Sequence, residues 1–421
     1  MLTVQYSVPV LQFLPTSRRL TKVVRPFALN GAAMAAPSRT ADGPLRDRLT
    51  EVMASVRALS VDIGPRLCGS EGERAAAKWL AGELRSAGYE TQIDPFPAYS
   101  TFMVVYAPLT ALGALAWALE WWAPVVGAAA ALIAGALLVV ENRPIQLLSR
   151  LVSFRRSHNV VATRQPGGES VRHVVVLAHI DSPVVSDVSN LTLVRLLYLG
   201  MIVSCGAIGA VGLTVGTGIS DRLLPMGAPF ALLLAACAGM MLHQALASPV
   251  VAGAGDNGSG VAAVLQAARE LPPLQRTTVW FVGDGGEEAG LLGAMRFVER
   301  HRLPRESTWF INVDMVSAGT LRTSAQEGML FRYRCDPDLC RIAAEEGRAE
   351  GLEVPSEVLR AMSTDACVPL SRGYRATTLS STKGYWHQLA DTVDNVDPTV
   401  VAQAAVLIRR MVERLDADAQ D

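Results

Sequence analysis

Apolar positions recur along most of the chain with the two periods that distinguish helices from strands. Runs rich in β-branched residues predict buried strands, and these runs occupy residues 172–178, 277–283, 307–313 and 374–380. Apolar residues at helical spacing predict helices at 45–60, 259–274 and 290–301, while residues 69–96 indicate a helix, a glycine stop and a strand. Alternating strands and helices are typical of an α/β domain, so we expect a mixed, mostly parallel central sheet flanked by helices.

Four apolar stretches interrupt this alternation. They carry no charged residue and lie at 102–119, 121–140, 196–219 and 223–242. Each is close to the ~20 residues that a helix needs to cross a bilayer, and they are rich in glycine and alanine, as packed membrane helices are. We therefore predict two transmembrane hairpins, at 102–141 and 191–246. The alternative is a set of buried helices in a large soluble core.

The two hairpins divide one expected catalytic domain into three parts, residues 45–101, 142–190 and 247–421. Because each hairpin has an even number of spans, the chain leaves the domain and returns to it on the same side of the membrane. Residues 1–41 contain basic residues and no acidic one. We expect 1–44 to be disordered, either upstream of a true start at Met34 or as a transit peptide.

Charge and cysteine usage exclude several classes of function. The chain has 38 basic and 39 acidic residues, which argues against nucleic acid as a partner. Its six cysteines include no CxxC pair, so a zinc ribbon or a dithiol redox motif is not expected. We expect the cysteines to be small buried residues, since a disulfide between Cys335 and Cys340 would need an oxidising compartment.

Polar residues of metal-ligand type follow every one of the four predicted strands. They are His179 and Asp181 after the first strand, Glu287 and Glu288 after the second, Asp314 after the third, and His387 and Asp391 after the last. Asp256 lies in a glycine-rich loop that opens a helix and can reach the same edge, because ligands gather where parallel strands end. The other histidines, at positions 158, 173, 243 and 301, lack such a setting.

This set of nitrogen and oxygen ligands suits a pair of zinc ions, with one carboxylate left over for acid and base chemistry. Two cations lower the pKa of a bridging water from about 15.7 towards about 7 and polarise a substrate carbonyl. A nearby carboxylate must then accept the proton of that water and pass it to the leaving amine. Glu287 and Glu288 would divide this work, one as base and one as ligand.

Five motifs in this order resemble the co-catalytic dizinc exopeptidase family, which contains bacterial leucine aminopeptidases, aminopeptidase Y and the glutamate carboxypeptidases. They are "AHIDS", "GAGDNGSG", "GGEEAGLLGA", "INVDM" and "GYWHQLADTVDNVDP". Upstream, "GPRLCGSEGERAAAKWLAGELRSAGYE" and "HNVVAT" resemble the opening helix and the second strand of the family. The likeness covers most of 45–101, 142–190 and 247–421, whereas the soluble relatives lack the apolar insertions.

The resemblance implies a role for each candidate residue. Asp256 would bridge two zinc ions, with His179 and Asp314 completing one site and Glu288 and His387 the other. Glu287 would be the general base, and Asp181 would orient His179. The family also tends to have a cis peptide after the bridging aspartate, here between Asp256 and Asn257. Asp365 is kept as a candidate substrate contact, and Ala366 stands where relatives often carry a histidine.

We therefore expect a membrane-anchored zinc aminopeptidase, whose partners are a peptide or protein N-terminus and the lipid bilayer. The hairpins would hold the entrance of the active site close to the bilayer and so favour membrane-bound substrates. Basic residues beside the spans place the catalytic domain in the cytoplasm by the positive-inside rule; they are Arg143, Arg150, Arg155 and Arg156.

Three other functions remain open. A carboxypeptidase or dipeptidase would need arginines to grip a terminal carboxylate, and the candidates are Arg332, Arg334, Arg360, Arg372 and Arg375. A glutaminyl cyclase on the same scaffold would normally use one zinc ion. A catalytically idle binding or receptor module is the alternative from another class of protein.

Overall fold

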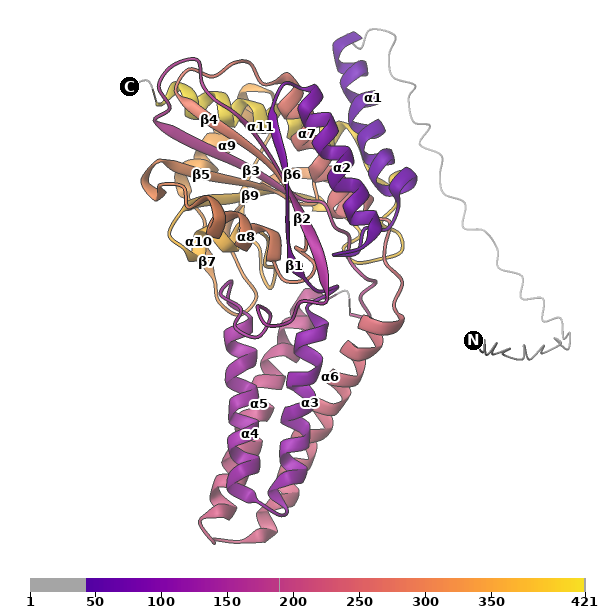
Figure 1. The fold of residues 1–421 in the computed structure, drawn as a ribbon, viewed down its shortest axis with the longest axis vertical. Coiled ribbons are helices and arrows are strands. Elements are labelled where there is room, and N and C mark those ends of the chain that lie inside the picture. Colours follow the sequence, from indigo (N-terminus) through magenta and orange to yellow (C-terminus); the bar gives the residue numbers. More distant parts are fainter. Residues whose placement is uncertain (1–42, 189, 420–421) are drawn as a thin grey trace, which may run out of the picture. The chain divides into compact units, whose positions relative to one another are not determined.

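The computed structural model of the protein describes residues 43–188 and 190–419, and the expected N-terminal disorder lies almost entirely outside these residues. Within them, nine strands form one sheet in the order β1-β2-β4-β3-β5-β9-β6-β7, with β8 paired to β6 (Figure 1). The strands are β1 (Glu90–Ala98), β2 (Arg155–Arg164), β3 (Arg172–His179), β4 (Thr277–Asp284), β5 (Thr308–Val313), β6 (Ala318–Glu327), β7 (Tyr333–Arg334), β8 (Ser356–Val358) and β9 (Arg375–Lys383).

The centre of the sheet is parallel and its outer parts are largely antiparallel. β4, β3, β5 and β9 are neighbours that run parallel, and they are the four strands predicted from the β-branched runs. β1 pairs antiparallel with β2, and β2 pairs antiparallel with β4. The predicted mixed α/β fold is confirmed, because strands buried on both faces need the nearly continuous apolar runs that the sequence shows.

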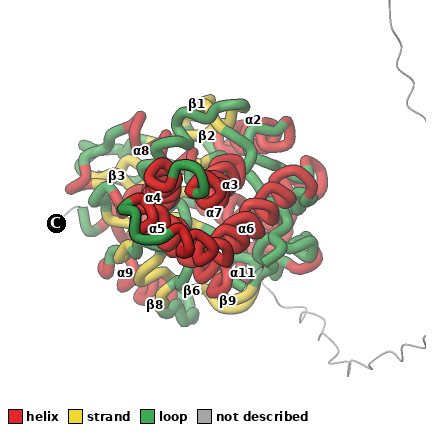
Figure 2. Tube along the Cα trace, turned by 90° about the horizontal axis from the view of Figure 1, so that it is seen from below, coloured by secondary structure: helices red, strands yellow, loops and turns green. Residues whose placement is uncertain are grey.

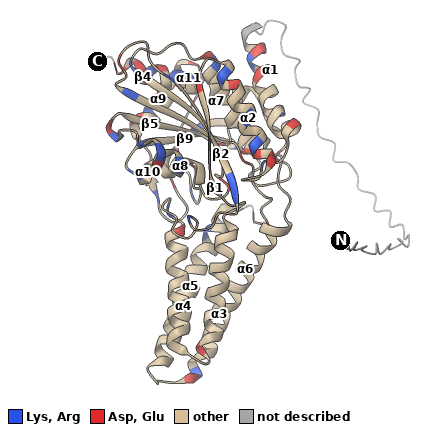
Figure 3. Cartoon of the chain, viewed as in Figure 1, with Lys and Arg blue, Asp and Glu red and all other residues tan. Residues whose placement is uncertain are grey.

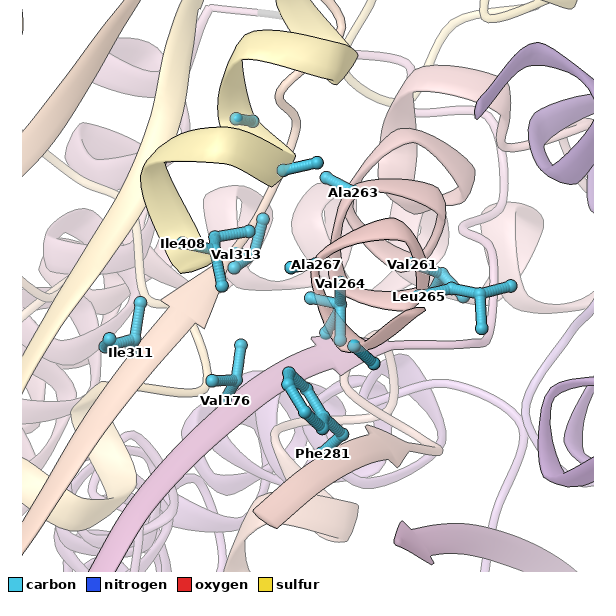
Figure 4. Packing of buried hydrophobic residues seen from close by; sticks show 14 of the residues in the cluster. Val176, Val261, Ala263, Val264, Leu265, Ala267, Phe281, Ile311, Val313 and Ile408 are labelled. Atoms are coloured by element: carbon cyan, nitrogen blue, oxygen red, sulfur yellow. The ribbon is translucent and has the colours of Figure 1, made fainter. Parts of the chain in front are cut away.

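Alternate residues of the central strands enter two separate cores. Val174 and Val176 of β3 belong to the core under helices α1 (Gly43–Arg57), α2 (Glu71–Ser86), α7 (Gly260–Glu270), α9 (Pro337–Ala349) and α11 (Pro398–Ala417). Figure 4 shows Val176, Phe281 and Ile311 of the sheet close to Val264 of α7 and Ile408 of α11. Val175 and Leu177 face the other core, which includes α8 (Leu292–His301) and α10 (Cys367–Ser371). This period of two is what a strand buried on both faces produces.

The four apolar stretches are helices. They form α3 (Met103–Glu120), α4 (Pro124–Glu141), α5 (Leu191–Gly216) and α6 (Ala228–Ala247), the last preceded by the 3₁₀ helix η2 (Asp221–Gly227). By length and composition, the four segments Met103–Glu120, Pro124–Glu141, Leu191–Gly216 and Asp221–Ala247 are long and apolar enough to cross a membrane. Figure 2 shows the helices side by side, and Figure 3 shows how few charged residues they carry. Their close approach depends on glycines, because a Cβ at Gly209 would lie 2.6 Å from Leu132.

Each helical hairpin starts and ends at paired backbone. The first lies between β1 and β2, whose last pair on this side is Ala98 with Arg155. The second leaves the domain after Val184 and returns at Val250, and these two residues form an antiparallel bridge. The Val251 amide also donates to the Pro183 carbonyl at 2.9 Å. The α/β domain therefore closes across both insertions as though the chain were uninterrupted.

Several elements were not predicted from the sequence. They are strands β6 to β8 and helices α9 and α11. For α9 a signal was present, because Asp336 caps the helix by accepting from the Leu339 amide and Pro337 occupies its first turn. All six cysteines are buried and free, so Cys335 and Cys340 form no disulfide and the expectation of small buried residues is confirmed.

Candidate metal centre

The carboxyl ends of the parallel strands bring the predicted ligands together. β3 ends at His179, β5 is followed directly by Asp314, and His387 lies in the loop after β9. Glu287 and Glu288 follow β4 in the turn before α8. These strands are parallel neighbours, so their ends lie at one edge of the sheet.

Asp256 reaches this edge from a short helical turn, η3 (Ala254–Ser259), which follows the second hairpin. Its Oδ1 lies 3.3 Å from Nε2 of His179, and its Oδ2 lies 3.8 Å from Nε2 of His387. On one side, Oδ1 of Asp314 lies 3.6 Å from Nε2 of His179. On the other, Oε2 of Glu288 lies 3.1 Å from Nε2 of His387. The two oxygens of Asp256 thus face two different histidine–carboxylate pairs.

These separations fit a metal ion in each pair. Two ligands about 2.0–2.1 Å from a tetrahedral zinc ion lie roughly 3.3–3.4 Å apart, and the atoms above are 3.1–3.8 Å apart. Asp256 belongs to both ligand groups, His179–Asp256–Asp314 and Asp256–Glu288–His387. Oδ1 of Asp314 is buried and has no hydrogen-bond partner in the described residues, as a ligand atom oriented towards a cation would be.

The electrostatics of the site also favour a cation. Burial, followed by repulsion from neighbouring carboxylates, raises the pKa of Glu287 and of Glu288 well above the ordinary value. Burial lowers the pKa of His387 to about 4, so this imidazole is neutral at physiological pH and can act as a ligand. A bound cation would stabilise the ionised carboxylates that burial disfavours.

Asp181 connects the two halves of the site. Its Oδ1 lies 3.6 Å from Nδ1 of His179, on the far side of the imidazole from Asp256. Its two carboxylate oxygens accept hydrogen bonds of 3.2 Å from the backbone amides of Glu287 and Glu288. One buried carboxylate therefore lies beside the ring of one predicted ligand and accepts hydrogen bonds from the backbone of two predicted site residues.

Two further residues fix the Asp256 loop: Asp391, one of the polar residues noted after the last predicted strand, and Asn257, for whose side chain no role was predicted. Asp391 accepts from the amides of Gly255 at 2.5 Å and Asp256 at 3.0 Å, and burial raises its pKa to about 6. Asn257 donates to the Val313 carbonyl at 2.8 Å and so joins the loop to β5. The peptide bond between Asp256 and Asn257 is cis, as the resemblance implied. Asp391 lies within the motif that contains His387, which was the available signal.

Arg66 holds the split domain together beneath the site. Its side chain is buried and donates five hydrogen bonds to backbone carbonyls. One acceptor is Ile180, next to His179, and two others are Ala252 and Gly253, where the chain returns from the second hairpin. Burial lowers the pKa of the guanidinium to about 10, which still leaves it charged at neutral pH.

The remaining sequence candidates lie elsewhere. Asp365 is fully buried beside Asp284 and does not line the cavity at the site, so the structure gives it no contact with substrate. The carboxylate oxygens of Asp284 and Asp365 have no hydrogen-bond partner among the described residues. The four other histidines take no part in the ligand groups that the described residues form, as expected.

A cavity of about 270 Å³ opens onto the site and is lined by Asp256, Glu287, Glu288, Asp314 and His387. It is the place where a substrate carbonyl could meet the predicted ligands and the predicted base together. Glu287 and Glu288 form a third close group with His179, in which the ligand atoms lie within 4.8 Å of one another.

Solved structures with the same fold include aminopeptidases and a Zn-dependent exopeptidase. An aminopeptidase from Aneurinibacillus sp. strain AM-1 is 14% identical with a TM-score of 0.52, and the match covers 87% of this chain and 93% of that one. A zinc aminopeptidase from Bacillus subtilis is 13% identical with a TM-score of 0.51, covering 87% and 95%. A Zn-dependent exopeptidase from Parabacteroides distasonis is 14% identical with a TM-score of 0.50, covering 87% and 97%. At such identities the likeness shows the fold alone.

A comparison with curated protein sequences finds no match. The sequence of residues 235–412 matches peptidase family M28, and this range contains Asp256, Glu287, Glu288, Asp314 and His387. The family match over residues 235–412 and the shared fold confirm the resemblance to the zinc exopeptidases that the motifs indicate.

Proposed function

We propose that this protein is a membrane-anchored aminopeptidase that uses two zinc ions. The observation that carries the proposal is the position of Asp256, whose two carboxylate oxygens face histidines of two different ligand groups. A carboxylate in this position can bridge two cations, whereas a single-metal site would leave one group without a function. The family match to a peptidase supports the same reaction class.

In this proposal His179, Asp256 and Asp314 would hold one zinc ion, and Asp256, Glu288 and His387 would hold the other. When bound, two zinc ions supply a polarised substrate carbonyl and a water with a pKa near about 7. Asp181 keeps the His179 imidazole in the orientation that presents Nε2 to the site.

Glu287 is the general base. It lines the cavity and lies within the close group that contains His179 and Glu288, but it is not needed in either group that contains Asp256. It accepts the proton of the attacking water and returns it to the amine of the leaving peptide. Its backbone amide is fixed by Asp181, so its carboxylate stays beside the reacting carbonyl.

The four apolar helices anchor the enzyme in a bilayer as two hairpins. Their length and composition support this, and small residues allow them to pack closely. Arginines at the domain end of the helices, including Arg143 and Arg150, support a cytoplasmic catalytic domain. Protease digestion of sealed vesicles tests this orientation, because only an outward-facing domain is cut without detergent.

The test compares the wild-type protein with Glu287→Gln, each purified in detergent and loaded with zinc. A mixed pool of peptides with free and blocked N-termini is incubated with both proteins, and the products are identified by mass spectrometry. We expect stepwise loss of N-terminal residues from the unblocked peptides only, and kcat several decades lower for Glu287→Gln.

Glu288→Ala is the matched control for the division of roles. Glu287→Gln should keep both zinc ions, whereas Glu288→Ala should lose metal at one site, measured as the zinc-to-protein ratio. Equal loss of metal in both variants would overturn the assignment of base and ligand.

The same peptide pool separates the rival functions. Removal of C-terminal residues would indicate a carboxypeptidase; within the described residues none of the five candidate arginines lines the cavity, although Arg143 does. Release of ammonia from N-terminal glutamine would indicate a cyclase. Binding without any product would move the protein to the receptor class.

A further inference from the structure

One cavity joins the candidate metal centre to the apolar helices. The cavity that contains Asp256, Glu287 and His387 on its wall is also lined by side chains from α3, α5 and α6. The two hairpins are therefore placed to do more than attach the domain to a membrane, because they form part of the wall around the reacting groups.

Helix α5 presents one face to this cavity. Val194, Tyr198 and Met201 line it and are three or four residues apart, which places them on one side of a helix. Leu196, between them in sequence, is 59% exposed and points away from the other helices. The lining residues lie near the start of α5, which is the end joined to the catalytic domain.

Helix α6 also presents one face to the cavity, near its C-terminal end. Cys237, Met241 and Gln244 line the cavity, again at helical spacing, and they lie near the end of α6 where the chain returns to the domain. Leu242, adjacent to Met241, is 53% exposed. Met240 also lines the cavity and is half-buried, so it is a position where a larger side chain can be introduced.

The wall is apolar and adaptable. Seven of the 13 methionines of the chain line the cavity, four from the apolar helices (Met103, Met201, Met240, Met241) and three from the catalytic domain (Met315, Met329, Met362). Methionine is unbranched and flexible, so this part of the wall accepts apolar groups of different shapes, whereas Glu141 and Arg143 line the cavity at the end of α4 and just after it.

The loop between β3 and α5 connects this wall to a predicted ligand. The Ser186 amide donates to the His387 carbonyl at 3.0 Å, and Ser186 and Val188 line the same cavity. After α4, the Gln146 side chain donates to the carbonyl of Gly290, close to Glu287 and Glu288. Both hairpins are thus fixed to the loops that carry the site.

We propose that α3, α5 and α6 form the pocket for the first side chain of the substrate, and that this pocket selects peptides with a large apolar N-terminal residue. The inference rests on the proposed aminopeptidase function and adds the substrate class. In an aminopeptidase the first side chain is attached next to the carbonyl that Glu287 must reach. The helix-lined part of the cavity is continuous with that position, and the wall there is apolar.

The direct test is photo-crosslinking to the Glu287→Gln variant, which does not depend on turnover. The probe is a peptide whose N-terminal residue is a diazirine analogue of leucine, and the control peptide carries the same analogue at its C-terminus. We expect the N-terminal probe to label residues within 191–201 and 237–244, with labelling suppressed by excess unlabelled leucyl peptide. Labelling confined to residues 315–386 would overturn the proposal.

A matched pair of substitutions on α6 tests selection. Met240→Trp fills the pocket, whereas Leu242→Trp adds the same side chain at an exposed position. Met240→Trp should lower kcat/KM for a leucyl peptide by about tenfold or more through KM, and change it little for an alanyl peptide. Leu242→Trp should alter neither substrate, and equal losses for both peptides in Met240→Trp would contradict the proposal.

The outcomes also separate this inference from the proposed function. If the wild-type protein hydrolyses no peptide but the N-terminal probe labels α5 and α6, the aminopeptidase function fails and the apolar pocket stands. If peptides are hydrolysed but a diazirine phospholipid labels these positions and leucyl peptide does not compete, the cavity is a lipid site and the inference fails.

Discussion

Arg66→Lys should destabilise the catalytic domain by removing hydrogen bonds that close it across the second insertion. The guanidinium is 1% exposed and donates to five carbonyls, of Leu59, Gly64, Ile180, Ala252 and Gly253. A lysine ammonium has three donors, so at least two of these five hydrogen bonds are lost. At about 1–3 kcal/mol for each hydrogen bond lost from this buried charged group, the free energy of unfolding falls by roughly 2–6 kcal/mol.

The assay is thermal unfolding in detergent, followed by fluorescence. At roughly 2 °C per kcal/mol for a domain of a few hundred residues, the Tm should fall by roughly 4–12 °C. The control is Arg74→Lys, because the Arg74 side chain is 47% exposed and, within residues 43–188 and 190–419, its ion pair is with Glu71 across one helical turn. A Tm for Arg66→Lys within about 1 °C of the control would refute the reasoning, since the carbonyls would then be satisfied without the guanidinium.

Three further changes test the site and the insertions. Asp391→Asn replaces a carboxylate that accepts from two backbone amides with a group that also donates. The zinc affinity, measured by chelator competition, should therefore fall about 10–100-fold. An unchanged Kd would contradict the positioning role of Asp391. Removing metal with a chelator should lower the Tm, and zinc at 100 times its Kd should restore about 2.7 kcal/mol of stability. A Tm that does not change when zinc is added would argue against metal binding. Replacing residues 191–246 with a short linker should leave a folded domain, because Val184 and Val250 can still pair. The variant should lose any preference for lipid-associated over soluble peptides. An unchanged preference would show that the second hairpin does not select substrate.

The structure reproduces those parts of the fold that local patterns encode. β3, β4, β5 and β9 were predicted because strands buried on both faces need nearly continuous apolar, β-branched runs, and each of these four segments has one. The two apolar hairpins were recognisable from the length of their apolar stretches and the absence of charged residues in them. β7 and β8 were not predicted, because two or three residues carry no detectable period and their pairing with β6 depends on the rest of the sheet.

The sequence by itself determined which residues are chemically able to form the site. His179, Asp256, Glu287, Glu288, Asp314 and His387 follow strands or open a helix, and that placement depends only on local pattern. Tertiary structure decided what holds them in place. The contacts of Asp391, Asn257 and Arg66 join segments far apart in the chain, and no local signal specifies such partners.

Tertiary structure also decided where the hairpins lie relative to the chemistry. The sequence shows that 191–246 separates His179 from Asp256, but it does not show that the residues flanking this segment pair with each other. Nor does it show that Met201 and Met241 line the same cavity as Glu287. Apolarity marks a residue for burial in protein or lipid, whereas the surface it meets is fixed only when the helices and the sheet are packed together.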